Sequence, residues 1–173
     1  MFRPARLRLS WFALVALALV FGACSHYRLG PPGELPFRTL YVAPVKNGSF
    51  APQAGATLTD QTITDLQGHS NLKIVENASA DATLEILIAN YERTVGATQK
   101  QDTGLAQSYM LRMQCIVTLK NNRTGEILMN SREIWAEQQA FVQGGFQIAE
   151  YQALPVLTRT MAQKISNAVV STW

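Results

Sequence analysis

One stretch of the sequence alternates between apolar and polar side chains, and it constrains the fold more than any other feature. In SYMLRMQCIVTLK, residues 108–120, every odd-numbered position is apolar and most even-numbered positions are polar. Because neighbouring side chains of a β-strand point to opposite faces, a period of two predicts a half-buried strand. We expect this strand to be central, with its odd-numbered side chains facing the core. They are Tyr109, Leu111, Met113, Cys115, Val117 and Leu119.

Four further segments have the composition of strands. FRTLYVAPV and NLKIVE are short β-rich runs, and ADATLEILIANYERTV is longer. In the longer run Leu84, Ile86 and Ile88 mark one face, whereas Leu87, Ala89 and Tyr91 make the other face partly apolar. NNRTG predicts a hairpin turn, after which EILMNSREIWAEQQAF returns as the partner of the alternating strand.

Two segments have helical spacing. In residues 52–68 Ala54, Leu58, Thr62 and Leu66 recur every four positions, and Gly68 fits a C-terminal cap. A second helix is expected from VQGG to near the end of the chain, where Pro155 must either start the helix or kink it. Its expected buried stripe is Tyr151, Leu154, Met161, Ile165 and Val169, with Leu157 and Ala168 beside it.

The order of these elements predicts an α+β domain. A strand and a helix are followed by four strands and a final helix, so a single mixed sheet of four to five strands with two helices packed on one face is the economical arrangement. We expect this domain to span residues 37–173, preceded by a lipoprotein signal and a linker. About 150 residues after the signal are enough for one domain with a core of its own.

The N-terminus has the build of a secretory signal. Three arginines lie within the first eight residues, and residues 9–23 follow without a charge. A membrane-spanning helix needs about 20 apolar residues, so this shorter run predicts a signal peptide over residues 1–23. A short uncleaved anchor is the alternative. Gly22 and Ala23 before Cys24 resemble a bacterial lipobox, although Phe21 stands where Leu is usual.

That resemblance makes Cys24 the lipidated N-terminus of the mature protein. Acyl chains such as palmitate would hold it at a membrane, because each buried CH₂ contributes about 0.8 kcal/mol. Ser25 follows Cys24 and mildly favours the outer membrane. Residues 24–36 are rich in Gly and Pro and predict an extended linker. Cys115 then has no cysteine left to pair with, and we expect it to be buried in a strand.

The charge balance argues against a nucleic-acid partner. The chain has 15 Lys and Arg against 12 Asp and Glu, and three of the arginines lie in the signal. The mature part is therefore formally neutral, with no broad face for a polyanion.

The sequence does not support an enzyme. His26 and His69 are the only histidines, and neither lies near clustered cysteines or carboxylates at the spacing of metal ligands. The chain also lacks a G-x-S-x-G nucleophile elbow and a phosphate-binding glycine loop. We therefore expect no catalytic residue, no metal and no cofactor.

The ordered set of segments resembles the lipopolysaccharide-assembly lipoprotein family LptE. The resemblance runs through CSHYRLG after the lipid cysteine, TLYVAPVKNGS, the helix and long strand of residues 58–92, the alternating strand with its hairpin, and KISNAVVSTW. It implies a lipid-anchored, periplasm-facing protein of the Gram-negative outer membrane. Such a protein plugs and helps to assemble the LptD-type β-barrel that inserts lipopolysaccharide at the cell surface.

Direct contact with lipopolysaccharide, which the resemblance also implies, would need basic side chains opposite phosphates. Arg93 and Lys100, which flank the loop TVGATQKQDTGLAQ, and Arg123 in the hairpin are the candidates. FVQGGFQ, after the fifth strand, carries no basic residue. The alternative function is a lipoprotein that regulates a periplasmic partner, like activators of cell-wall synthases or curli-secretion lipoproteins, whose domains open with a similar strand.

Overall fold

The computed structural model describes residues 35–69, 72–77, 79–98 and 105–171. The chain divides into two compact units, residues 1–33 and 34–173, and the first lies outside the described residues. The signal peptide, Cys24 and most of the linker are therefore not described. Among the described helices, none combines the length and apolar character that crossing a membrane requires.

The second unit contains a mixed sheet of six strands, which confirms the expected α+β class. Three short strands, β1 (Thr39–Val42), β2 (Lys46–Asn47) and β3 (Lys73–Ile74), pair in parallel with a neighbour. Three long strands, β4 (Ala82–Thr98), β5 (Ala106–Asn121) and β6 (Ile127–Phe141), form an antiparallel meander. The strand order is β3-β1-β4-β5-β6, with β2 pairing with β4 beyond the end of β1.

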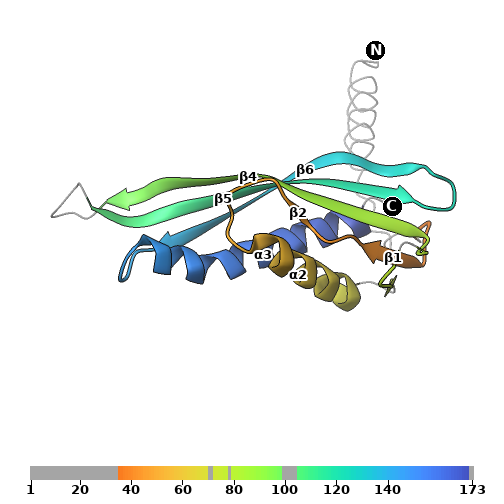
Figure 1. Ribbon diagram of the computed structural model, residues 1–173, viewed down its shortest axis with the longest axis horizontal. Helices are drawn as coiled ribbons and strands as arrows, with labels where there is room; N and C mark the ends of the chain where they lie inside the picture. The colour runs from red at the N-terminus through yellow and green to blue at the C-terminus, as the bar shows by residue number, and fades with distance from the viewer. Residues whose placement is uncertain (1–34, 70–71, 78, 99–104, 172–173) are drawn as a thin grey trace, which may run out of the picture. The chain divides into compact units, whose positions relative to one another are not determined.

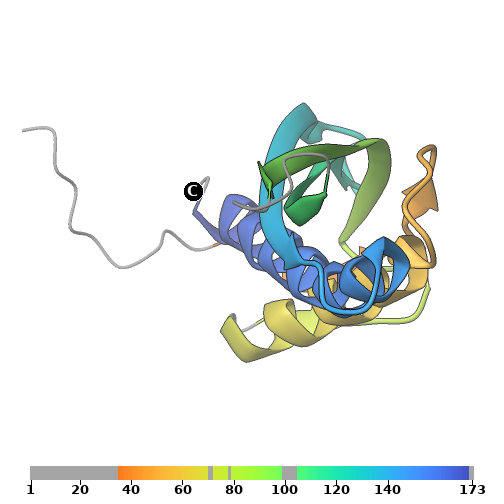
Figure 2. The ribbon, with the colours of Figure 1, turned by 90° about the vertical axis from the view of Figure 1, so that its left-hand side faces the viewer.

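Both helices lie on one face of the sheet, as the sequence predicts (Figures 1 and 2). They are α2 (Ala54–His69) and α3 (Phe146–Val170). Figure 2 shows α3 directly beneath the curved sheet, with α2 beside it. The opposite face of β4, β5 and β6 has no covering layer among the described residues.

The expected core of the alternating strand is confirmed except at Tyr109, which is only partly buried. Leu111, Met113, Cys115, Val117 and Leu119 are fully buried. β5 pairs with β4 on one side and β6 on the other, so it lies inside the sheet. The spacing in α2 also holds, since Ala54, Leu58, Thr62 and Leu66 are all fully buried.

A β-bulge in β4 corrects the expected facing of Tyr91. Ile88 pairs with Cys115 and Asn90 pairs with Gln114, so Ala89 is the extra residue on β4. An extra residue reverses the facing of all side chains that follow it. Tyr91 therefore joins Leu84, Ile86 and Ile88 on the buried face, rather than the opposite face.

The end of α2 differs from expectation, whereas α3 begins directly after VQGG, as expected. Gly68 lies inside the last turn of α2, which ends at His69, and so it is not a cap beyond the helix. Pro155 lies inside α3, nine residues after its start at Phe146, so it does not begin the helix. The preceding turn needs Gly144 and Gly145, whose φ angles of 90° and 116° are open mainly to glycine.

The stripe of α3 is confirmed except at one position. Leu154, Leu157, Met161, Ile165, Ala168 and Val169 are buried. Tyr151 was expected among them but is 77% exposed, and its neighbour Glu150 is buried instead. Glu150 is buried because two side chains of β4, Tyr91 and Arg93, contact its carboxylate.

Candidate functional site

A buried polar cluster joins β4 to the first turns of α3. The Tyr91 hydroxyl donates a hydrogen bond of 2.6 Å to Glu150 Oε1, and Arg93 Nε lies 2.7 Å from the same oxygen. The Arg93 guanidinium also lies 5.4 Å from the ring centres of both Tyr91 and Phe146, within the range of a cation–π contact. The pKa of Tyr91 is raised, mainly by burial of its hydroxyl and secondly by the neighbouring Glu150 carboxylate. The hydroxyl therefore stays protonated.

This geometry defines what Arg93 can do. One edge of its guanidinium is committed to Glu150, so Arg93 first holds α3 against the sheet. Its side chain is still 39% exposed, which leaves part of the guanidinium open to an anionic group from outside. Glu150 and Tyr91 were not expected as site residues, since a lone Glu in a helical pattern reads as a solvated charge.

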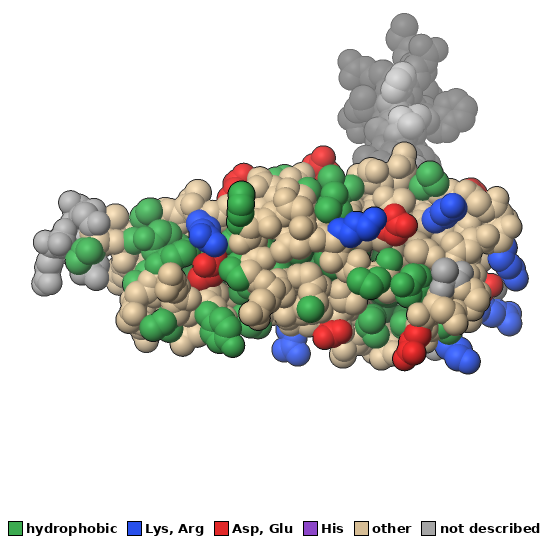
Figure 3. Space-filling view, viewed as in Figure 1, with side chains coloured by type: hydrophobic (Ala, Val, Ile, Leu, Met, Phe, Trp, Pro, Cys, Tyr) green, Lys and Arg blue, Asp and Glu red, His purple; other side chains and the backbone are tan. Residues whose placement is uncertain are grey.

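Apolar side chains gather around this cluster at the end of the sheet where β4 ends and β5 begins. We call this surface the distal tip. Figure 3 shows hydrophobic side chains concentrated there, at the left of the view. Tyr109 packs edge-on against Phe146 with ring centres 4.5 Å apart. The exposed members of the distal tip are Val95, Leu105, Phe141, Ile148 and Tyr151.

The other candidate cations lie elsewhere. Lys100 falls outside the described residues. Arg123 is highly exposed in the β5–β6 turn, with Nη1 3.6 Å from Asp81 Oδ1. In the β4–β5 ladder Ala82 pairs with Asn121 and Arg93 pairs with Leu111. Eleven residues of extended strand span roughly 36 Å, so Arg93 and Arg123 lie at opposite ends and cannot form one site.

Asp81 is a structural anchor beside Arg123. Its Oδ2 accepts hydrogen bonds of 3.0 Å from the backbone N–H groups of Arg38 and Thr39, and its own N–H donates to Thr39 Oγ1 at 2.8 Å. These bonds hold the start of β1 against the start of β4. The bonds from Arg38 and Thr39 lower the pKa of Asp81, with a smaller contribution from Arg123.

The uncovered face of the sheet carries a polar row across the three long strands. Glu92, Arg112 and Glu137 are direct neighbours in the ladder, and Arg112 Nε donates a 2.7 Å hydrogen bond to Glu137 Oε1. Arg112 also lies 5.8 Å from the ring centre of Trp135. In the next row Gln114 Nε2 donates to Glu133 Oε2 at 3.0 Å. This face is largely polar, although Leu87 and Trp135 add apolar area.

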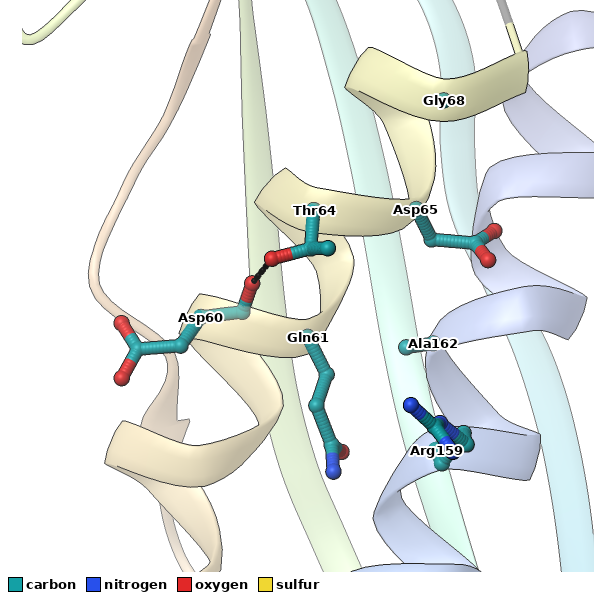
Figure 4. A pocket seen from close by; sticks show the side chains of 7 residues that line it. All are labelled: Asp60, Gln61, Thr64, Asp65, Gly68, Arg159 and Ala162. Carbon is teal, nitrogen blue, oxygen red and sulfur yellow. Dashed lines mark hydrogen bonds between the residues drawn. The ribbon is translucent and has the colours of Figure 1, made fainter.

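A groove of about 330 Å³ lies between α2 and α3 (Figure 4). Asp60, Gln61, Thr64 and Asp65 line it from α2, and Arg159 and Ala162 line it from α3. Gln61 Nε2 donates to the carbonyl oxygen of Pro155 at 3.2 Å, which links the two helices. Two carboxylates and one guanidinium line the groove, which has the composition of a polar helix–helix seam.

The described residues offer no arrangement for metal chemistry. No group of three or more His, Cys, Asp or Glu within them is placed to hold an ion. Cys115 is a free thiol, as far as the described residues go, and burial raises its pKa to about 12. A thiol of that pKa stays protonated at neutral pH and is a poor nucleophile.

Solved structures share this fold at low sequence identity. An uncharacterized lipoprotein B from Nitrosomonas europaea has a TM-score of 0.55 and 19% identity, covering 82% of this chain and 87% of its own. A protein from Xanthomonas campestris has a TM-score of 0.60 and 11% identity, covering 84% and 91%. A minor lipoprotein from Acinetobacter baumannii has a TM-score of 0.52 and 14% identity, covering 79% and 94%. Identities this low establish the fold alone.

The family assignment comes from the sequence. No curated protein matches the chain. The model of the family LptE, described as lipopolysaccharide-assembly, matches residues 37–169. That match runs from just before β1 to the last turn of α3, and it therefore takes in the whole sheet and both helices. The chain belongs to the LptE family, a family of non-enzymatic lipoproteins of the Gram-negative envelope, and its role is in lipopolysaccharide assembly.

Proposed function

We propose that this protein is anchored to the outer membrane through a lipid on Cys24 and docks inside the lumen of an LptD-type β-barrel. In that position it acts as a plug and as an assembly factor, and it turns over no substrate. The observation that carries the proposal is the family match across residues 37–169. The match takes in the uncovered sheet face as well as the core, so it extends to the surface that would meet a partner.

The character of the uncovered face supports a barrel lumen as its environment. The inner walls of outer-membrane barrels are polar, because their apolar side chains face the lipid. The row Glu92, Arg112 and Glu137, with Gln114 and Glu133 beside it, offers such a wall both donors and acceptors. A face this polar is stable without an apolar layer over it. It can also form direct and water-mediated hydrogen bonds with a polar surface.

We further propose that basic residues of the chain contact the phosphates of lipopolysaccharide. Arg93 is the favoured contact, because exposed apolar side chains of the distal tip lie around it and suit acyl chains. Lys100 and Arg123 remain candidates, and Arg123 would serve a separate contact at the opposite end of the sheet. A charge-assisted contact contributes about 1.5–3 kcal/mol, so its loss would weaken binding about tenfold or more.

Depletion in the native organism tests the assembly role. We expect the amount of correctly folded barrel to fall, and large hydrophobic antibiotics to become more toxic as lipopolysaccharide fails to reach the surface. A folded barrel and normal surface lipopolysaccharide after depletion would refute assembly, and a defect in cell-wall synthesis instead would favour the regulator. Ligand contact is tested separately with purified lipopolysaccharide and the variants Arg93→Lys, Lys100→Ala and Arg123→Ala. Arg93→Lys keeps the charge, whereas an alanine there would also release Glu150.

A further inference from the structure

The loop between β2 and α2 holds a phenylalanine almost entirely in solvent. Phe50 is 91% exposed, more than any other large apolar side chain of the described residues. The adjacent Ala51 is buried. The loop therefore points Ala51 into the domain and the ring of Phe50 out into solvent. A ring left in water forgoes the stabilisation that burial of its apolar surface would give, and a contact with a partner would supply it.

The exposure of Phe50 comes from a loop with fixed geometry. Asn47 Oδ1 accepts hydrogen bonds from the backbone N–H of Ser49 at 3.0 Å and from Ser49 Oγ at 2.8 Å. Asn47 Nδ2 donates to the carbonyl oxygen of Ala51 at 2.8 Å, and the Ala51 N–H donates to Ser49 Oγ at 3.2 Å. These bonds fix the backbone on both sides of Phe50, at Ser49 and at Ala51. The ring is thus presented by a loop whose conformation is already set.

The same loop is fastened to the sheet. The Gly48 N–H donates to the carbonyl oxygen of Ile88 at 2.9 Å, and a side chain at Gly48 would come within 3.5 Å of Leu87 Cδ1. Leu87 is partly exposed and pairs across the ladder with Ile116. The Phe50 loop thus borders the uncovered face, the face proposed above to meet the barrel, next to Leu87.

We propose that Phe50 is an anchor residue that inserts into an apolar pocket on the barrel partner. This inference rests on the proposed function and names the contact through which docking occurs. Binding energy at protein interfaces is concentrated in a few aromatic anchors that fill pockets, surrounded by polar contacts. A loop that holds its ring in place before binding also avoids the cost of ordering it afterwards.

The surroundings of Phe50 favour a protein pocket over a lipid surface. Lys46 is the only basic residue between positions 46 and 53, and Phe50 is the only large apolar one. Membrane-binding loops need several apolar side chains or a basic cluster, since one ring gives only weak and reversible attachment. A second copy of this chain is also disfavoured, because a stable dimer buries about 800 Å² on each partner and Phe50 is the only large apolar side chain of its loop.

The test compares Phe50→Ala, Phe50→Tyr and Val156→Ala in the mature, lipidated chain. Val156 is an exposed apolar residue of α3 outside the distal tip, and it serves as the control. The dissociation constant for the purified barrel of the same organism is measured in detergent, together with the melting temperature of each variant. We expect Phe50→Ala to bind the barrel about thirtyfold or more weakly at an unchanged melting temperature. Val156→Ala should bind within about threefold of the parent chain. Phe50→Tyr should fall between Phe50→Ala and the parent chain, because it keeps the ring but places a hydroxyl in the apolar pocket.

The possible failures can be told apart. If the parent chain does not bind the barrel, the proposed function itself fails. If the parent chain binds and Phe50→Ala binds equally well, the function stands and the anchor is wrong. Vesicles of phosphatidylethanolamine and phosphatidylglycerol, and sedimentation velocity, complete the test. Loss of vesicle binding or of a dimer in Phe50→Ala, with barrel binding unchanged, would assign Phe50 to a membrane or to a second copy and overturn the proposal.

Discussion

The hydroxyl of Tyr91 donates a buried hydrogen bond of 2.6 Å to Glu150, 59 residues further along the chain. Together with Arg93 it fastens the start of α3 to the outer half of β4, where α2 no longer contributes. The bond explains why a carboxylate occupies a position that helical periodicity would give to an apolar residue.

Removing this bond should destabilise the domain measurably. Tyr91→Phe is expected to lower the free energy of unfolding by about 1.5–3 kcal/mol, because a buried bond to a charged acceptor is lost with little change in packing. Urea denaturation followed by circular dichroism measures the change. Glu92→Gln, on the exposed side of the same strand, is the control and should change stability by less than about 0.5 kcal/mol. Equal effects of both variants would contradict the role given to Tyr91.

Adjacent positions of β5 should differ sharply in their tolerance to truncation. Leu111→Ala is expected to cost about 2–5 kcal/mol, because it leaves a cavity in a fully buried part of the core. Arg112→Ala removes a surface ion pair with Glu137 and an exposed contact with Trp135, and it should cost about 0–1 kcal/mol. Thermal unfolding of both variants tests the facing of the strand, which would be wrong if the two melting temperatures fell together.

Asp81 gives a prediction about acid stability. Its pKa lies below the ordinary value of 3.8 in the folded state, because backbone N–H groups of Arg38 and Thr39 stabilise the ionised carboxylate. The ionised form therefore stabilises the fold fully above about pH 4, and this contribution is lost as the pH falls through the lower, folded pKa.

The comparison with Asp81→Asn isolates that contribution. We expect the variant to unfold at a lower urea concentration than the parent chain at pH 7, and the gap to close as the pH falls below 3.8. Asn keeps an oxygen that accepts a hydrogen bond, so the pH-dependent part of the gap reports on the charge. A gap that is constant from pH 7 to pH 2.5 would show that the charge of Asp81 contributes nothing.

The anchor on Cys24 is tested by intact mass. Protein purified from its own membranes should begin at Cys24 and carry the added mass of acyl chains, and Cys24→Ala should give an uncleaved or soluble form. A full-length chain with an unmodified cysteine would rule out lipidation.

Local patterns predict most of this fold. The alternation of β5 and the four-residue spacing of Leu58 and Leu66 each depend on one element alone, and both are correct. The errors arise where contacts with residues distant in the sequence determine which way a side chain faces. The sequence of β4 does not indicate the bulge at Ala89, which turns Tyr91 inward. The sequence of α3 likewise does not indicate that Glu150 is buried against β4 while Tyr151 is exposed.

The candidate site was harder to predict for the same reason. Basic residues near turns can be recognised in a sequence. Only the pairing register of the strands shows that Arg93 and Arg123 lie at opposite ends of the sheet. Phe50 carries no sequence signal of exposure, because an aromatic residue within a loop is as often buried. Its position becomes informative only through the bonds of Asn47 and Ser49 around it.

The most direct measurement of the central claim is purification of the mature, lipidated chain from detergent-solubilised outer membrane, followed by identification of what accompanies it. Docking in a barrel lumen predicts a stable complex of about one copy of this chain with each LptD-type barrel. The complex should protect the Arg112 and Glu133 face from proteolysis and chemical labelling. Recovery of the chain without the barrel, or in a complex with a peptidoglycan synthase instead, would contradict it.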